Sequence, residues 1–578
     1  MRRLFTVVSC LTILGMLLAS CAPAAVPTPT SKPAAPPAAK PAPAAPTAAP
    51  AAKSAPTATK PAAKPAVPTA TPKPAVEQPR YGGILPISAQ SDPMSLDMHQ
   101  ESSYLTESVI QCPYNGITQF DPNNPEEVIG DLAKSWELSK DGLTYTFHLH
   151  ENVTFHDGTA CTAEDVAFSF ERMMNPPKGI RAPRRAELEP VDKIDAQDKN
   201  TVKFTMKNPF SPFMNVVSTG WMVIYSKAFI EKKEHMKNDV MGTGPYKFKS
   251  YAQGTSLEYV KNPSYFVKGR PYLDGITFYI IKDPGTRLAA FRTGQVKLTG
   301  VGASGLSPTD AETIKKEMPQ AILVPYPAWS RTEIMMHAQH KPWSDVRVRR
   351  AVHLAIDRQT AIKVLEHGYG DVGSHMPGQW GIPKDELLKM PGWRQPKDQD
   401  IAEAKRLLAE AGYPDGFEAK CLVRAEKQFE ELSVYVADQV AKIGIRLELD
   451  VKEPAVRTQL LRAGDWDFHP RVGSLAYADP HNWFRYWAPP LGEDWGMNYM
   501  RFSDEKTWEL FDKQTRAVDP AERKRIVREL DLRLIELAGM PLIFWRTAIL
   551  GMWPEVNNRG KVAGFFSFQK YQDIWLAK

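Results

Sequence analysis

Apolar and polar residues alternate strictly along residues 143–149, directly after the turn signal Lys140-Asp141-Gly142. Strict alternation predicts a β-strand with one buried face. Residues 152–156 are expected to form a second strand that ends at Asp157 and Gly158, because an Asp-Gly pair favours a turn. Together the two segments predict a hairpin.

Two later segments have the apolar spacing of amphipathic helices. In the first, Asp345 is the predicted N-cap, and the side chains of Arg347, Arg349 and Arg350 are expected to face solvent. The predicted buried stripe consists of Val348, Val352, Ala355 and Ile356. In residues 400–412, Asp400 is the predicted N-cap and Gly412 the stop. With the strands above, these helices predict a mixed α/β fold.

The first 21 residues have the pattern of an export signal. Arg2 and Arg3 precede an apolar run at residues 4–19, which is shorter than the roughly 20 residues that a membrane-spanning helix needs. The run ends in Leu-Ala-Ser-Cys, which resembles a bacterial lipobox, so Cys21 is the predicted lipidation site and the predicted membrane anchor. An ordinary secretory signal that contains a Cys near its cleavage site is the alternative.

Residues 22–80 consist mainly of Ala, Pro, Thr and Lys and hold 17 of the chain's 50 prolines. This composition predicts an extended, disordered tether without a core of its own. Basic residues exceed acidic ones by eight before residue 81, so the formal net charge of +6 leaves −2 for residues 81–578. The basic balance therefore lies outside the predicted globular part, and nucleic-acid binding is not indicated.

The 498 residues that follow the tether are too many for one hydrophobic core, so at least two lobes are expected. Cys112, Cys161 and Cys421 are few and widely spaced, which excludes a disulfide framework or a paired-cysteine metal site. We expect three buried thiols, with one disulfide as the alternative.

Six groups of motifs resemble, in order, those of the family 5 extracellular solute-binding proteins. The first is residues 82–99, Gly-Gly-Ile-Leu-Pro-Ile-Ser-Ala-Gln-Ser-Asp-Pro-Met-Ser-Leu-Asp-Met-His. The others are Leu-Ala-Lys-Ser-Trp at 132–136 with residues 141–149, Val-Thr-Phe-His-Asp-Gly at 153–158 with Thr-Ala-Glu-Asp-Val at 162–166, Gly-Thr-Gly-Pro-Tyr at 242–246 with Asn-Pro at 262–263, Trp-Ser-Asp-Val-Arg-Val-Arg at 343–349 with Ala-Ile-Asp-Arg at 355–358, and Ala-Gly-Tyr-Pro-Asp-Gly at 411–416. The resemblance covers nearly all of residues 81–578.

The resemblance implies a two-lobed clamshell of the periplasmic-binding-protein type (type II, cluster C-like), with an extra subdomain inserted in lobe I. Lobe I would comprise residues 81–124, 222–328 and 545–578, the inserted subdomain residues 125–221, and lobe II residues 329–544. Two crossings, near Ala328-Trp329 and Phe544-Trp545, would form the hinge. Closure of such lobes around a solute is a known switching mode.

The function implied is capture of an extracytoplasmic solute for an ABC importer by a monomer that delivers it to permease subunits. A sensory or chaperone-like binding protein without its own importer is the alternative. No enzyme, cofactor or metal is expected. His156 and Asp157, with Asp165 nearby, could form an acid/base or metal pair, but residues 155–158 are interpreted as the turn at the end of a hairpin. Residues 242–246 lack the Lys of a phosphate-binding loop.

The cleft residues are predicted by their position in the family pattern. They are Ser103, Tyr104, Trp221, Trp329, Ser330, Arg331, Gly473, Ser474, Leu475, Ala476, Tyr477, Asp479, Trp483 and Trp545. In peptide-binding members a carboxylate that holds the peptide's ammonium group stands where this chain has Ala476, unless Asp479 or another acid substitutes. The solute is therefore a peptide, or an opine, sugar or chelate. Arg331 is a possible partner for a ligand anion, and Arg471 is expected to be a solvated surface charge.

Overall fold

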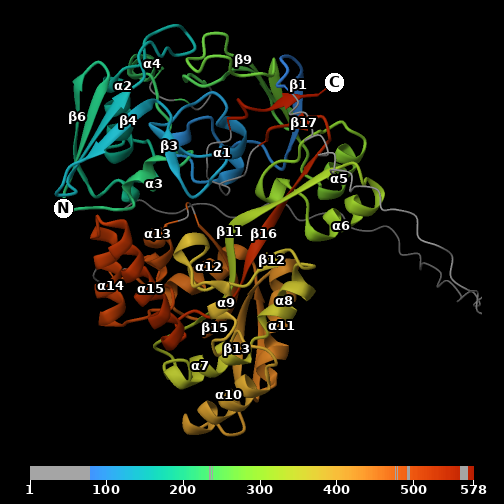
Figure 1. Cartoon of the computed structure of the whole chain (residues 1–578). Helices are drawn as coiled ribbons and strands as arrows, with labels where there is room; N and C mark the ends of the chain where they lie inside the picture. Colours follow the sequence, from blue (N-terminus) through green and yellow to red (C-terminus); the bar gives the residue numbers. More distant parts are fainter. Residues whose placement is uncertain are drawn as a thin grey trace, which may run out of the picture. The chain divides into compact units, whose positions relative to one another are not determined.

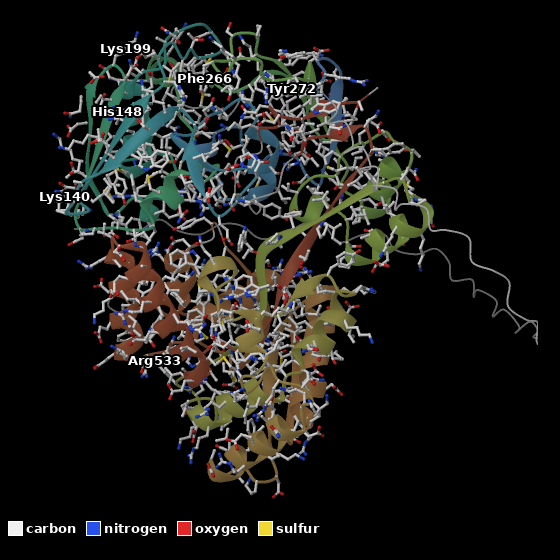
Figure 2. All side chains as sticks on the ribbon, in the orientation of Figure 1. Lys140, His148, Lys199, Phe266, Tyr272 and Arg533 are labelled. Atoms are coloured by element: carbon white, nitrogen blue, oxygen red, sulfur yellow. The ribbon has the colours of Figure 1, made fainter. Side chains whose placement is uncertain are left out.

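The computed structural model describes residues 78–577, except 234–235, 237–238, 476, 478, 491–494 and 560–569. Cys21 and all but the last three residues of the predicted tether lie outside these ranges. Val76–Lys578 forms one compact unit, to which all elements below belong. Within the described ranges, no helix is both long and apolar enough to cross a membrane. Charged side chains such as Lys140 and Lys199 lie at the periphery of this compact unit (Figure 2).

The first lobe contains a four-stranded sheet in the order β1-β10-β9-β8. Its strands are β1 (Ile84–Ala89), β8 (Tyr246–Ala252), β9 (Ser256–Lys261) and β10 (Gly275–Ile280); β1 is parallel to β10, and the other pairs are antiparallel. Helix α1 (Tyr104–Ile110) contributes to the same core, as do Met552, Tyr571 and Ile574 from the C-terminal end. The chain therefore returns to its first lobe at its end.

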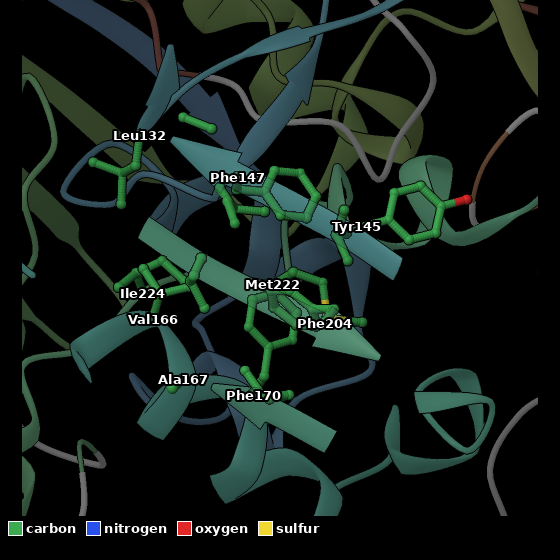
Figure 3. Close-up of a cluster of buried hydrophobic side chains, with 14 of the residues drawn as sticks. Leu132, Tyr145, Phe147, Val166, Ala167, Phe170, Phe204, Met222 and Ile224 are labelled. Atoms are coloured by element: carbon green, nitrogen blue, oxygen red, sulfur yellow. The ribbon is translucent and has the colours of Figure 1, made fainter. Parts of the chain in front are cut away.

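A second core in the first lobe surrounds an antiparallel sheet in the order β4-β5-β7-β6 (Figure 3). The elements are β4 (Ala133–Leu138), β5 (Thr144–Leu149), β6 (Val191–Asp198), β7 (Thr201–Met206), α2 (Ala163–Met174) and α3 (Phe213–Val217). Aromatic rings fill the space between the sheet and α2: Phe204 lies 5.6 Å from Phe147 and 5.1 Å from Phe170 between ring centroids. This core is separate from the core of the β1-β10-β9-β8 sheet.

The predicted strand at residues 143–149 is confirmed as β5, whose alternate residues are buried. The predicted hairpin is wrong, because β5 pairs with β4 and β7 instead of residues 152–156. One isolated bridge, between Thr154 and Ala160, closes the turn at Asp157 and Gly158. Both edges of β5 are already occupied, so the next segment cannot pair with it.

The second lobe contains a six-stranded mixed sheet in the order β12-β16-β11-β15-β13-β14. Its strands are β11 (Ile322–Met336), β12 (Gly370–Asp371), β13 (Phe417–Arg424), β14 (Ile445–Lys452), β15 (Phe468–Ser474) and β16 (Leu542–Met552). One core contains residues of α7 (Val346–Ala355), α10 (Asp398–Glu410) and α11 (Lys427–Ala441). Another contains residues of α12 (Pro454–Ala463), α13 (Pro480–Phe484), α14 (Glu505–Arg516) and α15 (Pro520–Leu537).

The remaining elements connect these layers. They are β2 (Thr118–Phe120), β3 (Val128–Gly130), β17 (Val556–Asn557), β18 (Trp575–Leu576), α4 (Lys227–Lys233), α5 (Pro284–Arg292), α6 (Pro308–Glu317), α8 (Arg358–Leu365), α9 (Lys384–Leu387) and the 3-10 helices η1 (Met98–Gln100), η2 (Arg185–Glu187), η3 (Gly302–Ser304), η4 (Gly378–Trp380) and η5 (Arg485–Trp487).

Strands β11 and β16 are long and antiparallel, and they run from one lobe into the other (Figure 1). Their ladder is regular from Ile322 opposite Met552 to Pro327 opposite Thr547, and it resumes at Arg331 opposite Trp545. Residues 328–330 of β11 therefore face only residue 546 of β16. Such a bulge interrupts the pairing and bends the strand at the passage between the lobes.

The two predicted helices form, but some of their charged residues lie elsewhere than expected. Asp345 caps α7 as predicted, through a hydrogen bond from the Arg347 N–H. Arg349 was expected in solvent and is instead buried, where it donates 2.8 Å and 3.2 Å hydrogen bonds to the carbonyl oxygens of Trp343 and Leu537.

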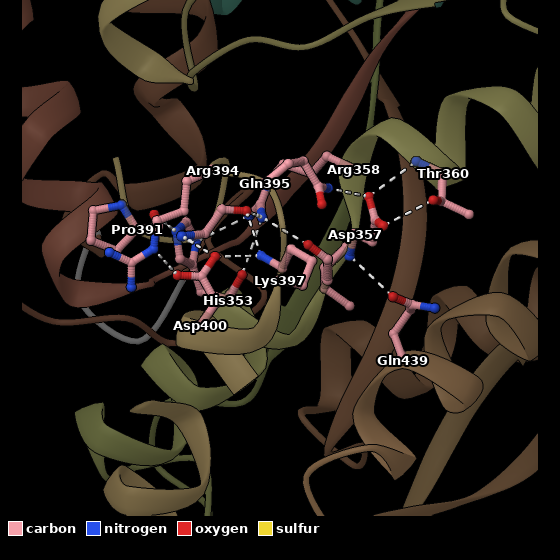
Figure 4. Close-up of polar contacts among 12 residues, drawn as sticks. His353, Asp357, Arg358, Thr360, Pro391, Arg394, Gln395, Lys397, Asp400 and Gln439 are labelled. Atoms are coloured by element: carbon pink, nitrogen blue, oxygen red, sulfur yellow. Dashed lines mark hydrogen bonds and ion pairs between the residues drawn. The ribbon is translucent and has the colours of Figure 1, made fainter. Parts of the chain in front are cut away.

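Asp400 is not the N-cap of α10, because that helix begins two residues earlier at Asp398. Its buried carboxylate instead accepts hydrogen bonds from Lys397, Arg394 and the Gly392 N–H (Figure 4). It thereby joins the first turn of α10 to the preceding loop. Gly412 ends the helix as predicted, with a φ of +94°. Cys112, Cys161 and Cys421 are buried free thiols, which confirms the predicted state of all three.

Candidate functional site

A cavity of about 1100 Å³ lies beside the bulge in the β11–β16 ladder. Both long strands supply part of its wall, and so do residues 371–386 and the first two turns of α15. Glu126, from the loop between β2 and β3 of the first lobe, also lines it, so close to Gly378 that a Cβ on that glycine would overlap the Glu126 carboxylate. The cavity is thus bounded by both lobes and by the strands that connect them.

Aromatic and apolar side chains dominate the wall of the cavity. Three tryptophans come from three separate segments: Trp329 from β11, Trp380 from η4 and Trp545 from β16. The other apolar wall residues are Pro325, Tyr326, Pro327, Val372, Met376, Pro377, Ile382, Pro383 and Ala521. Flat rings and rigid proline rings of this kind fit a planar or aliphatic part of a small solute.

Several charged wall residues already have partners within the protein. Lys384 pairs with Asp371, and Arg528 pairs with Glu386. The Arg546 Nε lies 3.0 Å from a carboxylate oxygen of Glu366, whose pKa burial raises. Glu126, Lys524 and Arg525 add further charged groups to the wall beside the aromatic surface.

Trp545 has a fixed orientation, because its Nε1 donates a 2.9 Å hydrogen bond to the carbonyl oxygen of Ser374. Gly373 makes this arrangement possible: a Cβ on that residue would lie 2.5 Å from Cδ1 of the Trp545 ring. The Trp329 indole is also buried, at 5% exposure, but among the described residues its Nε1 has no hydrogen-bond partner.

Arg331 lies in the core next to the cavity instead of lining it. Its guanidinium contacts the carboxylate of Glu333 and covers the ring of Trp483, 2.7 Å from the ring centroid. Burial lowers the pKa of Arg331 to about 9, against the opposing effect of Glu333. Trp483 is likewise buried completely and does not contribute to the wall.

Arg471 was expected at the surface and is instead buried, so this expectation was wrong. It lies directly opposite Glu333 on neighbouring strands, with 3.3 Å between Arg471 Nε and a Glu333 oxygen. Its Nη2 also donates a 3.0 Å hydrogen bond to the Tyr486 hydroxyl. A Cβ on Gly473 would lie 2.8 Å from Arg471 Nη2 and 2.9 Å from a Glu333 oxygen, so this glycine makes room for the ion pair.

Other predicted cleft residues surround the bulge without lining the cavity. The Leu475 N–H donates to the carbonyl oxygen of Trp329 at 2.8 Å, and the Ser330 hydroxyl donates to the carbonyl oxygen of Gly473 at 3.1 Å. The hydroxyl of Ser474 lies 3.3 Å from that of Ser330. This segment therefore holds the backbone of the bulge. Ala476 lies outside the described residues.

Asp479 is engaged within the protein. Its carboxylate accepts hydrogen bonds of 2.7 Å and 2.9 Å from Arg523, and one of 2.8 Å from the side chain of Asn215. Burial by itself would raise the pKa of Asp479, but Arg523 outweighs it and the pKa is lowered. The nearby Tyr477 belongs to the core around the β4-β5-β7-β6 sheet. Asp479 is thus an ion-pair partner and a cap of α13.

Ser103, Tyr104 and Trp221 lie in the first lobe and do not line the cavity. The Ser103 hydroxyl caps α1, of which Tyr104 is the first residue. Trp221 is completely buried beneath the Arg184 guanidinium, 3.5 Å from its ring centroid. Of the predicted set, the structure brings Trp329 and Trp545 together on the cavity wall.

Sequence reasoning did not identify the second-lobe loop that supplies Met376 and Trp380. Residues 373–383 combine three glycines, two prolines and a tryptophan, a composition typical of a surface loop. Nothing in their spacing has a helical or strand period, so no pattern connected them with the cavity.

The residues considered for catalysis have structural roles. His156 Nε2 lies 3.1 Å from the carbonyl oxygen of Gly244, and burial lowers the pKa of this imidazole to about 4. Asp165 forms the capping box of α2 with Thr162. Gly242 and Gly244 pack so closely on the backbone of Pro113 that a Cβ on either would overlap it. In the described part of the chain, no group of three or more His, Cys, Asp or Glu residues is placed to hold a metal ion.

Comparisons with known proteins agree with this architecture. The glutathione-binding protein GsiB of Pectobacterium atrosepticum is 31% identical over 375 residues, which cover 64% of this chain and 70% of that protein. Among solved structures, DppA from Helicobacter pylori in complex with the peptide STSA has a TM-score of 0.70 at 24% identity, covering 86% of this chain and 99% of that one. AgaA from A. tumefaciens R10 in complex with agropinic acid has a TM-score of 0.67 at 27% identity, with the same coverage.

The structural neighbours share the two-lobed α/β fold with this chain. A family model for bacterial extracellular solute-binding proteins, family 5 (middle region), matches residues 127–494. This match spans more than half of the chain and includes all elements from β3 to η5. The chain therefore belongs to family 5 of the bacterial extracellular solute-binding proteins.

Proposed function

We propose that this protein, the solute-binding component of an ABC importer, captures its solute in the cavity walled by Trp329, Trp380 and Trp545. The observation that carries the proposal is the convergence of three tryptophans from separate segments on one cavity at the crossing strands. Its volume of about 1100 Å³ suits a small organic solute. Binding there leaves the solute chemically unchanged, and no catalytic activity is assigned to the site.

The solute is proposed to be a small peptide or an opine-like compound. The relatives of this chain include a glutathione-binding protein, and its structural neighbours include proteins solved with a peptide and with agropinic acid. The carboxylate of Asp479 is already paired with Arg523, and residue 476 is an alanine. Ordinary recognition of a peptide's ammonium group at this segment is therefore disfavoured, which makes glutathione and agropinic acid the first compounds to test.

The lobe boundaries are proposed as residues 81–124, 222–328 and 545–578 for lobe I, 125–221 for its inserted subdomain, and 329–544 for lobe II. The bulge at residues 328–330 of β11, opposite residue 546 of β16, supports hinges at Ala328-Trp329 and Phe544-Trp545. A solute that contacts both lobes would favour their closed arrangement through its higher affinity for it.

The family acts outside the cytoplasm, and we propose that a lipid on Cys21 holds this chain at the membrane. The lipobox-like sequence before Cys21 supports this anchor. In a bacterial host, Cys21→Ser is expected to move the exported chain from the membrane fraction to the soluble fraction. Retention of the variant in the membrane fraction would contradict lipidation at this position.

The solute can be identified by native mass spectrometry of the purified chain, followed by denaturation and mass measurement of what is released. A peptide, glutathione-like or opine-like mass of unaltered structure is expected. Glutathione and agropinic acid are then titrated by calorimetry against the wild type and Trp380→Ala. Because the variant removes one wall of the cavity, we expect at least tenfold weaker binding. Unchanged affinity would place the solute elsewhere.

The alternative, a sensory binding protein without an importer, predicts the same binding data. Uptake of the labelled solute by cells that carry or lack the gene separates the two functions. Loss of uptake supports transport, and unchanged uptake supports sensing.

A further inference from the structure

Trp329 has an unusual backbone conformation for a large side chain. Its φ is +47°, in the left-handed region, where the Cβ of any residue except glycine crowds the following carbonyl oxygen. For a residue other than glycine, the left-handed conformation is disfavoured roughly 5- to 30-fold relative to the ordinary backbone conformations. Trp329 lies in the bulge of β11, where the ladder to β16 is interrupted between the two lobes.

Contacts from the second lobe hold this strained backbone in place. The carbonyl oxygen of Trp329 accepts a 2.8 Å hydrogen bond from the Leu475 N–H. The neighbouring residue, Ser330, bonds to the carbonyl oxygen of Gly473. These contacts fix the residue at the end of β15, at the point where β11 passes toward the first lobe.

The side chain of Trp329 adds a second, independent observation. Its indole lines the cavity and is 5% exposed, yet its Nε1 is buried with no hydrogen-bond partner among the described residues. A buried, unpaired donor is unfavourable, and an acceptor brought by a solute would satisfy it. Trp545, on the same wall, differs because its Nε1 already donates to Ser374.

We propose that Trp329 couples occupation of the cavity to closure of the lobes. Its left-handed backbone belongs to the closed arrangement and disfavours that arrangement while the cavity is empty. A solute with a carbonyl or carboxylate oxygen against the indole N–H stabilises the closed arrangement. This inference rests on the proposed function of the cavity and adds to it a required acceptor group on the solute.

Such coupling gives the strain a function. An importer that recognises the closed form must be protected from empty closed protein, and a conformational bias at the hinge lowers the population of that form. The solute reverses the bias because it provides an interaction that the empty cavity lacks.

The backbone part of the proposal is tested in the solute-free, full-length protein. Spin labels on Asn124→Cys and Asp385→Cys report the separation of the lobes, since both residues are exposed and each lies within two residues of a side chain that lines the cavity, Glu126 and Lys384 respectively. The buried thiols Cys112, Cys161 and Cys421 do not compete for the label, and Cys10→Ser with Cys21→Ser removes the two remaining thiols of the full-length chain. Pulsed electron paramagnetic resonance then gives the ratio of closed to open protein.

Trp329→Asn is expected to raise the closed-to-open ratio roughly 5- to 30-fold, because Asn tolerates the left-handed region. Trp329→Phe retains the strain and should leave the ratio unchanged. Trp380→Asn is the matched control, since it removes a ring from the same wall without altering the hinge. An unchanged or lower ratio in Trp329→Asn, or an equal rise in Trp380→Asn, would overturn the proposal.

The side-chain part is tested with glutathione as the probe. Trp329→Phe keeps an aromatic ring and removes the N–H, so binding is expected to weaken roughly fivefold. Equal affinity for the wild type and Trp329→Phe would overturn the role of the donor. If the wild type itself binds no glutathione, glutathione is excluded as the solute, while the distance measurement on solute-free protein still decides the proposal.

Discussion

The side-chain amide of Asn215 donates a 2.8 Å hydrogen bond to the carboxylate of Asp479 and so joins α3 of the first lobe to the start of α13 in the second. Two further contacts lie beside it. The Ser211 N–H donates to the carbonyl oxygen of Thr515 at 2.9 Å, and the ring of Phe210 meets that of His481 at 5.2 Å. These contacts form a second region, apart from the cavity wall, where the lobes touch.

Removal of the Asn215 amide should therefore favour the open arrangement. Loss of one hydrogen bond of this kind costs about 1 kcal/mol, so Asn215→Ala is expected to lower the closed-to-open ratio about fivefold. The spin-label pair at residues 124 and 385 measures this ratio. Asn208→Ala is the control, because its contact with Arg516 is exposed and should contribute little. Equal effects of the two variants would contradict a specific role for Asn215.

The ion pair between Arg523 and Asp479 is expected to be essential for the stability of the second lobe. Both side chains are almost fully buried, with 6% and 0% exposure. Arg523→Met would leave a buried carboxylate without its cation, which typically costs about 3–5 kcal/mol. Urea unfolding monitored by tryptophan fluorescence measures this loss.

Arg525 provides the matched control on the same helix. It pairs with Glu522, but its side chain is 64% exposed. Arg525→Met should therefore change the free energy of unfolding by less than about 1 kcal/mol. A comparable loss of unfolding free energy in both variants would show that burial of the Asp479–Arg523 pair does not increase its contribution to stability.

Gly473 tests the packing around Glu333 and Arg471. A Cβ there would come within 3 Å of both charged groups, which are buried and cannot move into solvent. We expect Gly473→Ala to destabilise the protein by about 1–3 kcal/mol, the usual cost of overpacking. Gly285→Ala is the control, because the nearest atom to its added Cβ lies 3.4 Å away. Equal stability of Gly473→Ala and the wild type would show that the pair can shift.

The elements that sequence patterns predicted correctly are those whose cause is local. The alternation of β5, the cap at Asp345 and the stop at Gly412 depend on neighbouring residues. The partner of β5 was missed because β7 lies more than 50 residues later in the chain, and nothing within the strand identifies it. Ordered motifs predicted the family and the two-lobed fold, since they reflect the whole chain at once.

The buried charges and most of the cavity wall could not be predicted for a related reason. A charged side chain is normally exposed, and Arg471 is buried because strand register places Glu333 opposite it. Such a partner lies 138 positions away in sequence. Trp329 and Trp545 were predicted near the crossing strands and line the cavity there, but the loop that carries Trp380 has no periodic pattern that would connect it with them.

Acid sensitivity should depend in part on Asp504. Hydrogen bonds from Arg533, at 2.6 Å and 2.7 Å, lower the pKa of this carboxyl from 3.8 to about 2. The folded state therefore holds the carboxylate form more strongly than the unfolded chain does. The resulting stabilisation is complete above a pH of about 4 and is lost as the pH falls toward 2.

Asp504→Asn keeps an N-cap for α14 but cannot form the ion pair. Its melting temperature is expected to be about 1 °C below that of the wild type at pH 7, and the difference should shrink as the pH falls from 4 to 2. Thermal melts of both proteins across this range measure it, and comparison of the two cancels the other carboxylates. A difference that stays constant down to pH 2 would assign the effect to capping alone, because the charge of Asp504 would then contribute nothing.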